Sequence, residues 1–90
     1  MTLYSFIYSE KALKDLNKLP RPTSDYITNK IDFFRHQENP FLFAKKLKGL
    51  FDLYRFRIGD YRAVFSVDDK GNIKILVILR IKHRKEIYRF

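Results

Sequence analysis

Residues 53–67 constrain the fold more than any other stretch, because they predict a tight two-stranded hairpin. The sequence reads LYRFRI, then Gly59 and Asp60, then YRAVFSV, and both arms alternate in character with the period of two that is typical of strands. A glycine followed by any residue suits a two-residue type II′ turn. With these two residues as the loop, Ile58 lies opposite Tyr61 and Arg57 lies opposite Arg62.

The two faces of the predicted hairpin differ in chemistry, since directly opposed residues share a face. One face is apolar and belongs to a core: Tyr54, Phe56, Ile58, Tyr61, Ala63 and Phe65. The other face brings Arg55, Arg57 and Arg62 close together. Three guanidinium groups repel one another unless an anion lies among them, and strand packing does not require such a cluster. The hairpin therefore predicts a phosphate-binding site; the alternative is a solvated strand face.

The N-terminal half predicts one strand followed by two helices. Residues 3–8 are rich in β-branched and aromatic side chains, which is typical of a strand. Ser9 has the chemistry of a helix N-cap for residues 10–18, and Pro20 ends that helix. Pro22 suits the first turn of a second helix that extends to about residue 35. The spacing of Ile27, Ile31 and Phe34 indicates a face packed on a core.

The second half predicts a loop, a basic connector and a last strand. Residues 36–40 form the loop, and residues 45–49 form the connector, in which Lys46 and Lys48 are candidate phosphate contacts. Residues 68–72 predict a turn and residues 73–81 a strand. We expect the odd-numbered residues of that strand to face the helices, and Lys74, Leu76, Ile78, Arg80 and Lys82 to face the other way. The expected fold is a single α+β domain over residues 1–90, with two N-terminal helices packed on a small twisted antiparallel sheet.

Composition narrows the classes of function. The net charge of +9 and the pI near 9.9 favour an anionic partner, either nucleic acid or an acidic protein rather than a membrane. The chain has no cysteine, which excludes disulfides and thiolate metal sites and fits a reducing, cytoplasmic compartment without requiring one. No paired carboxylates, histidine cluster or glycine-rich phosphate loop is visible, so we expect neither a metal nor a cofactor. The longest apolar run, residues 75–79, is too short to span a bilayer, and no signal peptide is visible.

Several short motifs, in their order and spacing, resemble the RelE/ParE superfamily of bacterial and archaeal toxins, most closely the RelE-type mRNA interferases. The motifs are LKGL at residues 47–50, YRFR at 54–57, YRAVF at 61–65 and HRKEIY at 83–88. The resemblance covers essentially the whole chain. It implies a microbial-ribonuclease-like fold and the toxin of a type II toxin–antitoxin system, which enters the ribosomal A site and cleaves messenger RNA. It also implies an antitoxin partner, which we expect to be acidic or amphipathic and to cover the basic groove.

The resemblance also implies roles for the hairpin arginines in metal-free RNA cleavage by the ribose 2′-OH. This chemistry needs proton transfer and cations that stabilise the developing phosphorane. Arg62 matches the family's hairpin arginine and is expected to stabilise the transition state. Arg55 and Arg57 match two positions that are lysines in the best-known RelE proteins. Because an arginine is effectively never deprotonated, we expect these two to bind phosphate rather than to act as bases.

Proton transfer is therefore expected from the C-terminal tail. Histidine changes charge near neutrality, so His83 is the first candidate and Lys82 the second. Arg84 adds positive charge for phosphate binding. The resemblance makes Tyr88 an active-site tyrosine that stacks on or orients a base, which is a common use of aromatic side chains on RNA. The alternatives are that His83 is a surface residue and that Tyr88 closes the core.

Two other functions remain open at this stage. One is a ParE-like inhibitor of DNA gyrase with no nuclease activity, and the other is a RelE homologue that binds its antitoxin without cleaving RNA. The joint presence of Arg62, the basic hairpin strand and the tail at residues 83–88 favours RelE-like cleavage.

Overall fold

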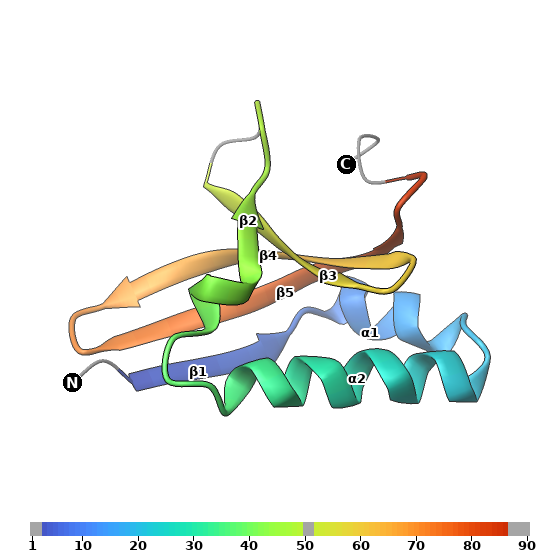
Figure 1. Cartoon of the computed structure of the whole chain (residues 1–90), viewed down its shortest axis with the longest axis horizontal. Coiled ribbons are helices and arrows are strands. Elements are labelled where there is room, and N and C mark those ends of the chain that lie inside the picture. Colours follow the sequence, from blue (N-terminus) through green and yellow to red (C-terminus); the bar gives the residue numbers. More distant parts are fainter. Residues whose placement is uncertain (1–2, 50–51, 87–90) are drawn as a thin grey trace.

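The protein is an α+β structure in which two helices cover one face of a five-stranded sheet, and no helix of the described residues covers the other face, which we call the open face (Figure 1). This computed structural model describes residues 3–49 and 52–86. The elements are β1 (Leu3–Tyr8), α1 (Glu10–Asn17), α2 (Arg21–Arg35), the 3₁₀ helix η1 (Pro40–Phe43), β2 (Ala44–Lys46), β3 (Leu53–Ile58), β4 (Tyr61–Lys70) and β5 (Ile73–His83). The strand order is β1-β5-β4-β3-β2. The α+β fold class expected from the sequence is confirmed.

The central hairpin has the predicted register. Strands β3 and β4 pair antiparallel, with Ile58 opposite Tyr61 and Arg57 opposite Arg62. Gly59 has a φ of 60°, whereas Asp60 does not adopt a positive φ. A positive φ at the first central residue alone is the type II′ pattern, which needs glycine there. The turn chemistry of two residues thus sets the register of the central strands.

Both predicted helices form, and their apolar sides meet the sheet. The side chain of Ser9 caps α1 by accepting a hydrogen bond from Ala12 N at 3.1 Å. Pro22 lies in the first turn of α2, where a missing N–H costs nothing. The predicted core residues of α2 are buried: Ile27, Ile31 and Phe34.

A stack of aromatic rings forms the centre of the core. Phe56 of β3 has the ring of Phe34 at a centroid distance of 4.5 Å and the ring of Phe65 at 4.6 Å. Phe56 and Phe65 are completely buried, and Phe34 is 4% exposed. Full burial of a side chain of this size stabilises the fold by roughly 1.5–3 kcal/mol. This stack therefore joins α2 to the central hairpin.

The sheet is mixed rather than antiparallel throughout, because β1 runs parallel to β5. Strands joined by two-residue turns must be antiparallel, as β3 and β4 are. In contrast, no tight turn joins β1 to β5. The two helices and strands β2 to β4 lie between them in the chain, so β1 and β5 are able to pair in the parallel sense.

Strand β5 contains a β-bulge that the sequence did not predict. Val64 lies opposite Arg80, but the next residue, Phe65, lies opposite Ile78, so Leu79 is the extra residue. The prediction that the odd-numbered residues of this strand all face the helices is therefore wrong before the bulge, where Leu76 and Ile78 are completely buried in the core. Beyond the bulge the predicted alternation holds.

The connector and the second turn also differ from the sequence prediction. Lys45 and Lys46 belong to the short edge strand β2, which pairs antiparallel with β3. Strand β4 extends to Lys70, so the predicted turn at residues 68–72 shrinks to Gly71 and Asn72. No helix in residues 3–49 and 52–86 is long and apolar enough to cross a membrane.

Candidate nucleic-acid interface

Cationic side chains line up across three strands on the open face of the sheet. Lys82 of β5 lies directly opposite Arg62 of β4, which lies directly opposite Arg57 of β3. Directly opposed residues have Cβ atoms about 4.5–5.5 Å apart. We call Arg55, Arg57, Arg62, Lys82 and Arg84 the cationic face. The prediction that the three hairpin arginines share one face is confirmed, and Lys82 joins them.

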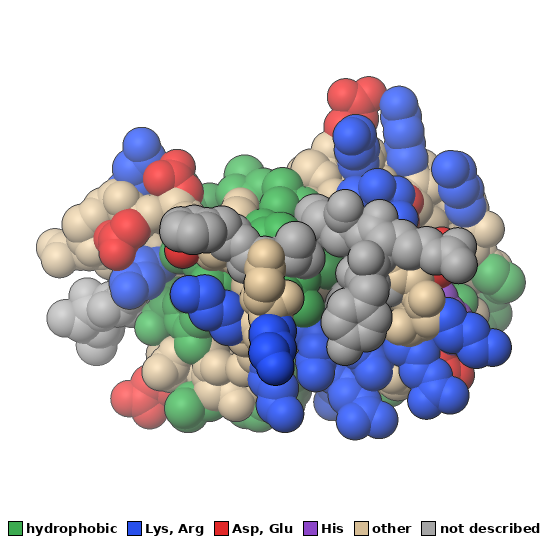
Figure 2. Space-filling view, turned by 90° about the horizontal axis from the view of Figure 1, so that it is seen from above, with side chains coloured by type: hydrophobic (Ala, Val, Ile, Leu, Met, Phe, Trp, Pro, Cys, Tyr) green, Lys and Arg blue, Asp and Glu red, His purple; other side chains and the backbone are tan. Residues whose placement is uncertain are grey.

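A second row of side chains lies beside the first and contains cationic side chains together with the apolar Val64. It runs from Arg80 through Val64 and Arg55 to Lys45 across β5, β4, β3 and β2. Val64 is completely buried because Leu47, which follows β2, packs against it. Seen from the open face in Figure 2, Lys and Arg side chains gather mainly toward the right-hand end, whereas several acidic side chains lie at the left-hand end.

Arg62 lies at the centre of the cationic face and is held against its own hairpin. Its Nη1 donates hydrogen bonds to the carbonyl oxygens of Gly59 at 3.0 Å and Tyr61 at 2.9 Å. Burial lowers the pKa of the guanidinium, and the nearby charges of Arg55, Arg57 and Arg84 lower it further, against a smaller opposite effect of Asp60. The protein thus holds a cation where its charge is disfavoured, and a bound anion would relieve that cost.

The chain beyond β5 folds back on the hairpin turn and brings Arg84 to this face. The backbone N–H of Arg84 donates to the carbonyl oxygen of Asp60 at 2.7 Å. The Nε atom of Arg84 lies 3.9 Å from Asp60 Oδ1. Because both residues are largely exposed, this ion pair is weak and leaves Arg84 available to a phosphate.

His83 is not brought onto the cationic face. It lies opposite Tyr61, whose ring packs against the main core on the helix side of the sheet. The two rings meet edge to face with centroids 5.4 Å apart. The backbone N–H of Lys85 donates to His83 Nδ1 at 3.2 Å, so this nitrogen is already an acceptor. Of the two tail candidates for proton transfer, the structure places Lys82 beside Arg62 and His83 on the opposite side.

The remaining sequence candidates are only partly gathered at the site. Lys46 lies opposite Tyr54, a core residue, and so shares the helix side of the sheet rather than the cationic face. Lys48 is exposed in the turn after β2. Tyr88 lies outside the described residues. Lys45, which sequence reasoning did not single out, lies opposite Arg55; only the pairing of β2 with β3 could have identified it.

Comparison with known proteins gives the family. A family model described as the ParE toxin of the type II toxin–antitoxin system, parDE, matches residues 6–88. The chain belongs to this family of toxins, within the RelE/ParE superfamily. No curated protein sequence matches at a significant level.

Solved structures place the toxin near RelE. The archaeal RelE–RelB complex from Pyrococcus horikoshii has a chain that is 32% identical over 93% of this toxin and 97% of that chain, with a TM-score of 0.64. The RelBE2 complex from Mycobacterium tuberculosis gives 27% identity over 93% and 94%, with a TM-score of 0.71. The chromosomal ParDE system of Pseudomonas aeruginosa gives 17% identity over 90% and 96%, with a TM-score of 0.68, and so shows a shared fold. The resemblance inferred from the sequence is confirmed at the level of the superfamily.

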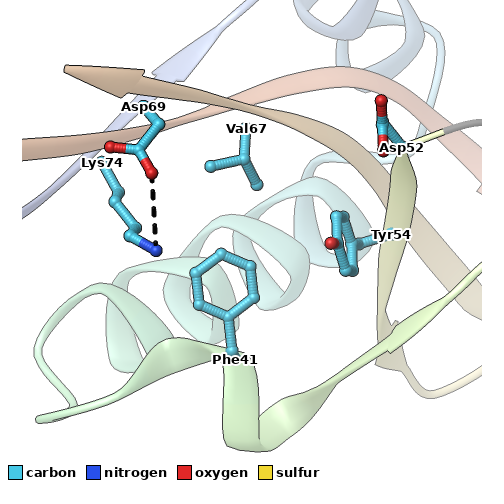
Figure 3. Close-up of a pocket in the computed structure, with 6 residues that line it drawn as sticks. All are labelled: Phe41, Asp52, Tyr54, Val67, Asp69 and Lys74. Carbon is cyan, nitrogen blue, oxygen red and sulfur yellow. Dashed lines mark ion pairs between the residues drawn. The ribbon is translucent and has the colours of Figure 1, made fainter. Parts of the chain in front are cut away.

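A pocket of about 400 Å³ lies on the helix side of the sheet, away from the cationic face (Figure 3). It is lined by Phe41, Asp52, Tyr54, Val67, Asp69 and Lys74. Inside this pocket, Lys74 pairs with Asp69, since Lys74 Nζ lies 3.7 Å from Asp69 Oδ2; it also lies 5.9 Å from the ring centroid of Phe41. Across residues 3–49 and 52–86, no group of three or more His, Cys, Asp or Glu side chains could hold a metal ion. None of the residues that line the pocket belongs to the cationic face.

Proposed function

We propose that this RelE/ParE toxin is a ribosome-dependent endoribonuclease, which cleaves messenger RNA in the A site by metal-free attack of a ribose 2′-OH. The observation that carries the proposal is the row of Lys82, Arg62 and Arg57 on the sheet face that α1 and α2 do not cover. Such a row is costly to folding, and its chemistry matches an RNA backbone. The toxin's higher identity with chains of RelE complexes than with a chain of the ParDE system supports the same conclusion.

The arginines supply charge at the reacting phosphate. The 2′-OH gives its proton to water as its oxygen attacks the adjacent phosphorus, the bond to the 5′-oxygen breaks, and a cyclic phosphate and a 5′-hydroxyl end remain. Arg62 stabilises the doubly charged phosphorane, because its planar fork matches two phosphate oxygens. Arg55, Arg57 and Arg84 bind the flanking phosphates, and Lys46 and Lys48 contribute at longer range.

Lys82 is the side chain to which we assign proton transfer. It lies directly opposite Arg62, and an amine can give up and take a proton, whereas a guanidinium cannot. As an ammonium group, Lys82 can protonate the leaving 5′-oxygen. His83 fits this role less well, since it faces the other side of the sheet and its Nδ1 already accepts a hydrogen bond. Tyr88 is proposed to stack on the substrate base, as the resemblance implies.

A second candidate is a ParE-like inhibitor of DNA gyrase. The description of the matching family model favours it, because that model is named for ParE. A homologue that binds its antitoxin without cleaving RNA is the third. In both cases the cationic face would serve only to bind an acidic partner.

Single-turnover cleavage of messenger RNA on programmed ribosomes tests the proposal. We expect the wild-type toxin to create new ends with a 5′-hydroxyl in the A-site codon, and Arg62→Ala to lose most of this activity. Arg21→Ala is the matched control, because Arg21 is an exposed arginine of α2 that pairs with Asp25. A parallel assay of gyrase-linked DNA breaks examines the second candidate: breaks without RNA ends would replace the proposal by the ParE-like function.

A further inference from the structure

The bulge in β5 decides which side chains reach the cationic face. Ile78 is completely buried on the helix side of the sheet. In a regular strand, residues two and four positions later would share that side, and Arg80 and Lys82 would then point toward the helices. The extra residue Leu79 inverts the alternation, so that Ile81 enters the core and Lys82 lies opposite Arg62.

A bulge interrupts the ladder of backbone hydrogen bonds, and here a neighbouring segment supplies partners. The backbone N–H of Ser9, between β1 and α1, donates to the carbonyl oxygen of Ile78 at 2.8 Å. The Ser9 hydroxyl donates to the carbonyl oxygen of Leu79 at 2.9 Å. The backbone N–H of Ile81 donates to Asp15 Oδ2 of α1 at 2.9 Å. Three backbone groups around the bulge are thus bound by the start of α1 and its second turn.

Asp15 also binds the side chain that follows the bulge. Its two carboxylate oxygens accept hydrogen bonds from Nε and Nη2 of Arg80, at 2.9 and 3.0 Å. The Asp15 side chain is only 12% exposed and that of Arg80 is 30% exposed. Burial raises the pKa of Asp15, but hydrogen bonds from Arg80 and Ile81, with the charges of Arg80 and Lys82, outweigh it and leave the pKa below its ordinary value. Arg80 therefore belongs to this contact and is not a free phosphate ligand.

We propose that Ser9, Asp15 and Arg80 form a clamp that fixes the bulge at Leu79 and thereby positions Lys82 beside Arg62. The clamp residues are positioning residues, which act on the reaction only through Lys82. The structural part of this inference is independent of the activity, whereas its catalytic consequence rests on the proposed endoribonuclease function.

The first test measures the bulge itself by NMR. In the wild-type toxin, we expect cross-strand contacts between the backbones of Arg62 and Lys82 and slow hydrogen exchange of the Ile81 amide. In Asp15→Asn, the Arg80 contact loses its charge, and we expect Ile81 exchange to accelerate about tenfold or more as the local opening free energy falls. Arg80→Gln, which keeps Asp15 as the acceptor for Ile81, gives a second, milder variant if Asp15→Asn does not fold. Asp32→Asn is the matched control, since Asp32 pairs with Arg35 on α2 and has no hydrogen bond or ion pair to β5 among the described residues.

The second test is a double-mutant cycle on single-turnover cleavage. If Asp15 acts through Lys82, Asp15→Asn lowers the rate at saturating ribosomes, but adds nothing in a Lys82→Ala background. A purely structural role would lower both backgrounds by the same factor. Additive effects, or an Ile81 amide that exchanges equally fast in wild type and Asp15→Asn, would overturn the clamp. If the wild-type toxin cleaves no RNA, the endoribonuclease proposal fails, and the exchange experiment still decides the positioning inference.

Discussion

The two faces of the sheet make opposite contributions to folding. On the helix side, Phe34, Phe56 and Phe65 stack with almost no exposed surface, which is the arrangement that stabilises a small domain most. On the open side, Lys82, Arg62 and Arg57 lie directly opposite one another, an arrangement that destabilises a sheet. The helix side therefore accounts for the stability of the fold, whereas the open side retains charge at a cost to folding, which fits the proposed binding of RNA.

The same comparison separates two kinds of arginine on β4 and β5. The positive charge of Arg80 is balanced by the carboxylate of Asp15, to which Arg80 donates two hydrogen bonds, and these bonds raise the pKa of Arg80. Arg62 has only carbonyl partners among the described residues, and its pKa is lowered. Arg80 therefore contributes to the fold through its contact with Asp15, whereas Arg62 keeps a positive charge that suits the proposed phosphate ligand.

The largest expected effect on stability comes from the helix side. Phe56→Ala should lower the free energy of unfolding by about 3–5 kcal/mol, because it removes the central ring of the stack and leaves a cavity. Urea unfolding followed by circular dichroism measures it. Phe33→Ala is the control, since Phe33 is 47% exposed and should cost far less. Equal losses would mean that the stack does not dominate the core.

The two tail candidates should separate in rate. Lys82→Ala should reduce single-turnover cleavage by roughly the 10²–10⁴-fold typical of losing an acid–base group. The sequence alone predicts a loss of that size for His83→Gln, but because His83 lies opposite Tyr61 on the helix side, we expect its rate to stay close to that of the wild type. A large loss in His83→Gln with an unchanged rate in Lys82→Ala would return the role to the histidine.

Arg62→Ala should separate activity from stability. We expect cleavage to fall by about 10²–10³-fold, as for the removal of one preorganised transition-state donor. The melting temperature should not fall, because Arg62 lies directly opposite the like charges of Arg57 and Lys82, which disfavour its own charge in the folded state. Paired measurements of cleavage and thermal unfolding check both parts. A clear drop in melting temperature would make the arginine a structural residue.

Acid should weaken the clamp at Asp15. Its folded pKa lies below the unfolded value of about 3.9, so its stabilisation is complete above that value and is lost as the pH falls toward the folded pKa. Asp15→Asn should therefore destabilise the toxin at pH 7, and the difference from wild type should shrink below about pH 4. Urea unfolding of both proteins at pH 7 and pH 3 measures this. A difference that is equal at the two values would exclude ionised Asp15 as the source.

The smallest effect is expected in salt dependence. Arg55→Ala and Arg57→Ala should each reduce the slope of log affinity against log salt for ribosome or RNA binding by about 0.7–1, the value of one phosphate contact. Association of the antitoxin should also slow as salt rises if the contact is electrostatic at its rim. Lys30→Ala, on α2 near the rings of Phe33 and Phe34, serves as the control with the same change in charge. An unchanged slope would remove the two arginines from phosphate binding.

The central hairpin, its arginine face and the two helices could be predicted from the sequence, because these features depend on neighbours along the chain. A glycine in a two-residue turn sets the register of β3 and β4, and a period of two then separates Phe56 from Arg57. The N-cap at Ser9 and the spacing of Ile27, Ile31 and Phe34 are equally local signals.

The side chains that surround those arginines depend on strand pairing and on the bulge, which no local pattern indicates. The pairing of β2 with β3 selects Lys45 over Lys46. The sequence predicts Lys82 on the open face, but only the bulge at Leu79 reconciles that position with the burial of Leu76 and Ile78 in the same strand. No local pattern indicates the bulge, because the groups bound to its backbone come from far away in the chain: Ser9 is 70 residues from Leu79, and Asp15 is 66 residues from Ile81. A one-residue insertion in a strand reverses every side chain that follows it, and its position is fixed by contacts that form only when the ends of the chain meet.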